Sequence, residues 1–188
     1  MTEFVLEPEA GVMPAARYIP TTNYNERPEG AVVSLIVVHS ISLPPGEFGG
    51  DDIIKLFTNC LPPDGHPYYL GIVGTPVSAH LLIDRAGELT QFVPFEKRAW
   101  HAGVSEFQGQ RECNDYSIGI ELEGTGDVAY EDVQYQRLAK ICAELMQQYP
   151  DITPERIVAH SDVAPGRKTD PGPTFDWQYF RQLLSKAD

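Results

Sequence analysis

The chain of 188 residues is the size of one domain and long enough to bury a hydrophobic core, so we expect a single domain over residues 1–188. Fourteen Lys and Arg residues against 27 Asp and Glu residues leave a formal charge of −13, which repels nucleic-acid phosphates and anionic membrane surfaces. The composition therefore argues against nucleic-acid and membrane partners and favours a small or neutral molecule.

The cysteines and the start of the chain bear on cellular location. Cys60, Cys113 and Cys142 are odd in number and lack CxxC spacing, which indicates neither a disulfide framework nor a zinc knuckle. Residues 1–20 carry glutamates where a signal peptide needs basic residues, and no apolar run reaches the ~18 residues of a membrane span. We expect a cytoplasmic protein that acts as a monomer.

The first half of the chain predicts strands around one short helix. "VVSLIVVHS", residues 32–40, is β-branched and apolar enough to form a strand buried on both faces. "LPPGEFGG" ends it, and "DDIIKLFTN" predicts a short helix with acidic residues in its first turn. "SAHLLIDRAGELTQFVP", residues 78–94, predicts a hairpin that turns at residues 84–87.

The second half predicts two more strands and two longer helices. "SIGIELEG", residues 117–124, alternates apolar and polar residues, as does a strand with one face in the core. Residues 131–149 have the apolar spacing of an amphipathic helix, which Pro150 ends. "ERIVAH" predicts a short buried strand, and "FDWQYFRQLLSKA" a closing helix with Asp176 as its N-cap. This mixture predicts an α/β or α+β domain around one sheet.

Two of the five histidines, His39 and His160, each stand at the C-terminal end of a β-branched strand. Neighbouring strand ends would bring both imidazoles to one edge of the sheet, and a catalytic zinc site uses three protein ligands. Asp170, stiffened by Pro171, is the favoured third ligand, and Asp162 is the alternative. A purely structural role stays open, because strand-end histidines commonly form ordinary hydrogen bonds and Asp-Pro-Gly is a common turn.

Lys168 and Glu121 are candidates for catalysis beside such a metal. Lys168 stands two residues before Asp170, so both side chains point to the same side of an extended segment, where a lysine stabilises charge on an attacked carbonyl. Glu121 shares the polar face of its strand with Glu123 and with Gly119, which would let another group approach closely. A glutamate at a metal site carries a proton from water to a leaving amine. A solvated loop lysine and an ordinary wet sheet face are the alternatives.

"WHAG", residues 100–103, suits the wall of a groove for a sugar or peptide, because aromatic faces pack on apolar faces while an imidazole forms hydrogen bonds. Trp100 fits a core position equally well. The same reservation applies to His66 and His80. Cys113 has no basic neighbour, so we interpret it as structural.

Three segments carry a resemblance to a known family. They are "VVHSISLPPGEFGG", "SAHLLIDRAGELTQFVPFEKRAWHAGVSEFQGQRECNDYSIGIELEG" and "HSDVAPGRKTDPGPTFDW". In this order they resemble the zinc-dependent N-acetylmuramoyl-L-alanine amidases of the AmpD type, from about Arg17 to the last helix. The match includes long loops as well as strands, so it is far more specific than any single motif.

The resemblance implies roles for five residues. His39, His160 and Asp170 bind zinc, Glu121 is the general acid/base, and Lys168 stabilises the oxyanion. It also implies a central mixed β-sheet flanked by helices, with the zinc in a groove along one face. The implied substrate is a muropeptide, 1,6-anhydro-N-acetylmuramic acid joined through its lactyl group to L-alanine. Cleavage of that amide belongs to peptidoglycan recycling, through which relatives also restrain β-lactamase induction.

Two positions depart from the family, and two other functions are alternatives. Ser40 follows His39 where close relatives carry asparagine, and Pro76 stands where relatives often carry arginine, so the substrate contacts differ while the zinc residues are kept. A non-catalytic peptidoglycan-binding module typically loses a metal ligand, whereas this chain keeps all three. A glycosidase using Glu121 and Glu123 as paired carboxylates leaves the strand-end histidines unexplained.

Overall fold

The structure is a computed structural model that describes residues 11–187. The expectation that residues 1–20 contain no signal peptide falls partly on residues 1–10, which lie outside the described residues. In chain order the elements are β1 (Arg17–Tyr18), β2 (Tyr24–Glu26), β3 (Leu35–Ile41), α1 (Asp52–Phe57), η1 (Pro67–Gly71), β4 (Leu81–Ile83), β5 (Leu89–Gln91), β6 (Lys97–Ala99), β7 (Glu106–Phe107), β8 (Gln110–Arg111), η2 (Cys113–Asp115), β9 (Ser117–Glu123), α2 (Asp132–Gln148), η3 (Pro154–Arg156), β10 (Ile157–Ala159), α3 (His160–Val163) and α4 (Trp177–Ala187).

A six-stranded sheet in the order β1-β5-β4-β9-β3-β10 forms the centre of the fold. The β4–β5 hairpin is antiparallel, and the other neighbouring strands are parallel. Two small antiparallel sheets, β2 with β6 and β7 with β8, accompany it. The expected mixed sheet flanked by helices is thus confirmed, as are the predicted hairpin and the longer strands.

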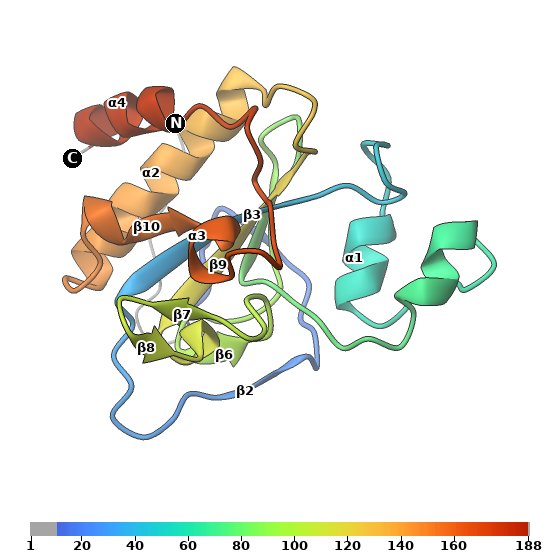
Figure 1. Cartoon of the computed structure of the whole chain (residues 1–188), viewed down its shortest axis with the longest axis horizontal. Coiled ribbons are helices and arrows are strands. Elements are labelled where there is room, and N and C mark those ends of the chain that lie inside the picture. The colour runs from blue at the N-terminus through green and yellow to red at the C-terminus, as the bar shows by residue number, and fades with distance from the viewer. Residues whose placement is uncertain (1–10, 188) are drawn as a thin grey trace.

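Helices α2 and α4 cover one face of this sheet, as Figure 1 shows. Alternate strand residues such as Ile36 and Ile118 pack there against Leu138 of α2 and Phe180 of α4, in the largest hydrophobic cluster of the described residues. Asp176 caps α4 as predicted, because its Oδ1 accepts the Tyr179 N–H at 2.8 Å. Period-2 alternation therefore leaves the other set of strand side chains on the opposite face.

The opposite face is covered by short elements and loops. Leu35 and Val37 of β3 pack there with Ala102 and Cys113, while Leu82 of β4 packs in a neighbouring cluster with α1. All seven residues of β9 are buried. The prediction of only one buried face for this strand is therefore wrong, because both faces are covered. Beneath these loops, polar side chains of β3 and β9 are shielded from water.

Several elements have no counterpart in the sequence pattern. Strands β1, β2, β6, β7 and β8 are two or three residues long, too short for a period to be detected. His160 begins the short helix α3, which the sequence pattern does not predict. Of the helices in residues 11–187, none has the length and apolarity needed to cross a membrane.

Leu138→Ala tests the packing of α2 on the sheet. Leu138 is fully buried, so we expect the free energy of unfolding to fall by about 2–5 kcal/mol, since truncation removes buried contacts and leaves a cavity. Denaturant unfolding of the whole chain measures it. Gln147→Ala, on the exposed side of the same helix, is the control and should change stability by less than ~0.5 kcal/mol. Equal effects of the two substitutions would contradict this packing.

Candidate metal centre

The parallel pairing of β10, β3 and β9 gathers three side chains at one edge of the sheet. His39 lies near the C-terminal end of β3, and Glu121 is its partner in register on β9. His160 directly follows Ala159, which pairs with Val38 of β3. The sequence-based prediction that the two histidines meet at one edge is confirmed, since their ring centroids are 4.3 Å apart.

The loop after α3 brings Asp170 back to the same point. Ser161 N–H donates to the Asp170 carbonyl at 3.1 Å, and the Tyr130 hydroxyl donates to the Pro171 carbonyl at 2.7 Å. Gly172 passes so close to Gly126 that a Cβ at position 172 would lie 2.5 Å from the Gly126 Cα. These contacts hold the Asp170 carboxylate in one direction.

Three potential ligand atoms converge in this corner. His39 Nδ1 and His160 Nδ1 are 2.9 Å apart, and Asp170 Oδ2 lies 3.3 Å from the first and 3.0 Å from the second. Ligand atoms of a tetrahedral zinc site with bonds of about 2.0–2.1 Å are themselves about 3.3 Å apart. A single cation would satisfy all three atoms at once, so the donor set fits zinc.

The electrostatics of the corner suit a metal as well. Burial lowers the pKa of His39 to about 4, against the opposing hydrogen bond with Asp170. Burial alone would raise the pKa of Asp170, but hydrogen bonds from His160 and His39 outweigh it and hold that pKa low. At neutral pH His39 is therefore a neutral imidazole and Asp170 an ionised carboxylate, the forms that bind metal ions.

Glu121 lies beside this corner with an unused oxygen. Its side chain is buried, and Oε2 has no hydrogen-bond partner. Burial, and then the Asp170 charge, raise the pKa of Glu121 well above its usual range, while the Lys168 ammonium opposes them. Lys168 is exposed, and its charge acts on both Glu121 and His39. The structure thus gathers His39, His160 and Asp170 with Glu121 beside them. Lys168 lies close enough for its charge to act on Glu121 and His39.

The rival residues have structural partners of their own. Asp162 is exposed, and its Oδ2 accepts the Ala159 N–H at 2.8 Å at the start of α3. Glu123 accepts the Gly49 N–H at 2.5 Å and the Arg85 N–H at 3.1 Å, one on each carboxylate oxygen. Glu121 and Glu123 are therefore not equivalent, which argues against a pair of glycosidase carboxylates.

The expected "WHAG" groove wall is wrong for His101 and stays a prediction for Trp100. Trp100 donates to the Asn25 side chain at 2.6 Å, but the His101 ring turns inward and contacts His39. The usable signal was Gly119, because a Cβ there would lie 2.4 Å from the His101 ring. His80 is buried and bonds to the Gly119 N–H, and His66 bonds to the Tyr68 N–H.

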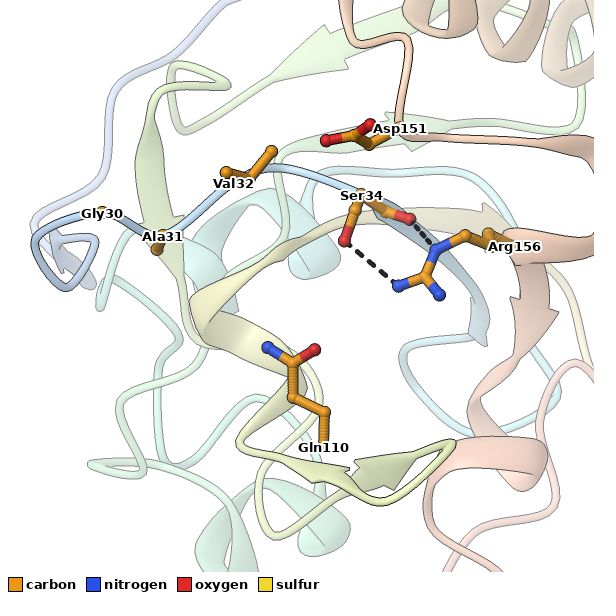
Figure 2. A pocket seen from close by; sticks show the side chains of 7 residues that line it. All are labelled: Gly30, Ala31, Val32, Ser34, Gln110, Asp151 and Arg156. Atoms are coloured by element: carbon orange, nitrogen blue, oxygen red, sulfur yellow. Dashed lines mark hydrogen bonds between the residues drawn. The ribbon is translucent and has the colours of Figure 1, made fainter.

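Two hollows of similar size lie at opposite ends of the strands. One of about 400 Å³ adjoins Asp170 and includes Ser40 and Thr125 in its lining. The other, about 460 Å³, lies at the amino ends of β3 and β10 (Figure 2). There the Arg156 guanidinium donates to the Ser34 carbonyl and hydroxyl, and the dashed lines show that this cation already has partners. Of these two hollows, the first is the one that borders the candidate metal centre, because Asp170 forms part of its lining.

The sequence and the structure match known amidases. Residues 29–173 match the family model described as N-acetylmuramoyl-L-alanine amidase. The chain is 55% identical to 1,6-anhydro-N-acetylmuramyl-L-alanine amidase AmpD of Escherichia coli over 95% of this chain and 97% of the relative.

Solved structures agree. A crystal structure of a selenomethionine derivative of AmpD superposes with a TM-score of 0.91 at 55% identity and covers 93% of this chain and 97% of its own. The amidase AmiD from E. coli, in complex with the substrate anhydro-N-acetylmuramic acid-L-Ala-D-γ-Glu-L-Lys, superposes with a TM-score of 0.59 at 31% identity over 84% of this chain and 60% of its own. The chain therefore belongs to the N-acetylmuramoyl-L-alanine amidase family.

Proposed function

We propose that this protein is a zinc-dependent amidase that cleaves the amide between the lactyl group of 1,6-anhydro-N-acetylmuramic acid and L-alanine in muropeptides during peptidoglycan recycling. The observation that carries the proposal is the convergence of His39, His160 and Asp170 within 3.3 Å of one another, beside the unpaired oxygen of buried Glu121. Support for the substrate comes from the names of the AmpD relative and of the AmiD complex.

His39, His160 and Asp170 would hold the zinc ion. Zinc in such a site polarises the amide carbonyl and lowers the pKa of water. Proton transfer and stabilisation of the developing charge are the roles of protein side chains. Glu121 takes the proton from the attacking water and delivers it to the departing alanine nitrogen, a shuttle that its raised pKa suits. Lys168 stabilises the negative charge that develops on the carbonyl oxygen.

The hollow beside Asp170 is the proposed place of the muropeptide. Its lining of Ser40, Ser42 and Thr125 offers hydroxyl groups for a sugar or peptide. Ser40 is one of the two departures from relatives, and a hydroxyl there replaces a longer amide. Pro76, the other departure, is exposed and carries no polar side-chain group. We therefore place the altered substrate contacts of this protein at these two positions.

The wider setting follows the same proposal. We place the enzyme in the cytoplasm as a monomer, with residues 1–188 forming one amidase domain. The charge of −13 favours a soluble muropeptide over an anionic surface, and the family match covers residues 29–173. Removal of muropeptides would also limit β-lactamase induction.

Asp170→Ala tests the metal centre. The wild type should hold about one zinc per chain, as a mononuclear site requires. It should also release stem peptide from anhydromuramoyl-tripeptide. The variant should lose both, because one of three ligands is gone. Metal analysis and product chromatography measure the two losses. Asp162→Ala is the matched control, since it removes a carboxylate from the preceding helix α3 and should keep zinc and activity. Loss of zinc from that control instead would contradict the choice of Asp170.

Glu121→Gln tests the proton shuttle. The amide keeps the size of the side chain but cannot carry the proton, so kcat should fall by at least about 10²–10⁴-fold while zinc stays bound. Glu123→Gln, on the same face of β9, should retain turnover, because Glu123 holds backbone N–H groups. Retained activity in the Glu121 variant, or release of a reducing sugar in place of stem peptide, would rule out this mechanism.

A further inference from the structure

His101 contacts the candidate metal ligand His39 from behind. His101 Nδ1 lies 2.8 Å from His39 Nε2, and the two rings are nearly perpendicular at 88°. The other nitrogen of His101, Nε2, lies 3.2 Å from the Ser117 hydroxyl. One imidazole therefore bridges the back of His39 and strand β9.

Metal binding through His39 Nδ1, together with these contacts, would fix one tautomer for each ring. If Nδ1 of His39 offers its lone pair towards His160 and Asp170, the His39 proton must reside on Nε2. That N–H then donates to His101 Nδ1, which leaves the His101 proton on Nε2, where it faces the Ser117 hydroxyl. A single proton arrangement thus satisfies both rings and leaves His39 Nδ1 free.

Ala102, the residue after His101, orients the second histidine of the centre, His160, in a similar way. His160 Nε2 lies 3.2 Å from the Ala102 carbonyl, which accepts the proton on that ring. Asn114 Oδ1 accepts the N–H groups of both His101 and Ala102, at 3.2 and 2.8 Å. Two consecutive residues held by one asparagine therefore orient both imidazoles.

Strand β9 makes room for this arrangement. A Cβ at Gly119 would lie 2.4–2.6 Å from three atoms of the His101 ring, so only glycine lets the ring lie flat on the strand. Ser117, Gly119 and Glu121 share this face, so the strand that carries the proposed proton shuttle also supports the ring behind His39.

We propose that His101 is a positioning residue that holds His39 in the tautomer and orientation whose Nδ1 binds the metal. The inference rests on the metal centre of the proposed function. It assigns His101 to the support of a ligand, in place of the groove wall that the sequence predicts. A partner of this kind typically changes metal affinity 10–100-fold.

The test compares two variants of equal size. His101→Asn keeps an acceptor near the place of Nδ1, whereas His101→Leu removes it and keeps the bulk. Zinc affinity of the full chain, measured by chelator competition, should fall about 10–100-fold in the leucine variant and stay near the wild-type value in the asparagine variant.

His80→Leu controls for the loss of a buried histidine. Its ring centroid lies 5.8 Å from that of His101, so we expect lower thermal stability with zinc affinity retained. Equal losses of affinity in the two His101 variants, or wild-type affinity in His101→Leu, would overturn the positioning role. If the wild type binds no zinc, the metal centre itself fails and the inference falls with it. If the wild type binds zinc, a negative result concerns His101 alone.

Discussion

Desolvation of polar groups at the carboxyl edge of β3, β9 and β10 is the constraint on which the site depends. Two imidazole nitrogens and a carboxylate oxygen lie within 3.3 Å of one another; the two imidazoles are buried, and the carboxylate is partly exposed. Burying such groups is unfavourable unless each finds a partner. Parallel pairing and the held Asp170 loop fix the groups in place, so the sheet carries a group of ligand atoms that a cation would complete.

Much of the fold was predictable because its long elements have a clear period. The apolar spacing of α2 and the β-branched run of β3 extend over enough residues to be detected, and the hairpin turn has its own composition. The strands of two or three residues form through pairing with distant segments. Arg17 and Thr90, for example, are neighbours in β1 and β5, and no local pattern contains that contact.

The candidate site was predictable to a similar degree. The histidines at strand ends could be recognised from the sequence, but the choice between Asp170 and Asp162 depended on the resemblance. Asp162 accepts a hydrogen bond from the Ala159 N–H, and this bond is the physical difference between the two aspartates. His101 was misjudged because the direction of its ring is set by Gly119, which is remote in sequence and adjacent only in the folded sheet.

The distribution of the proposed metal ligands along the chain would link metal supply to folding. His39 and His160 are 121 residues apart, and Asp170 lies ten residues further on. An unfolded chain therefore does not hold the two histidines together. A metal that binds only the folded form adds its binding free energy to stability, about 2.7 kcal/mol at a free concentration 100 times its Kd. Cellular zinc availability would thus govern the lifetime of this protein against proteolysis as well as its catalytic competence.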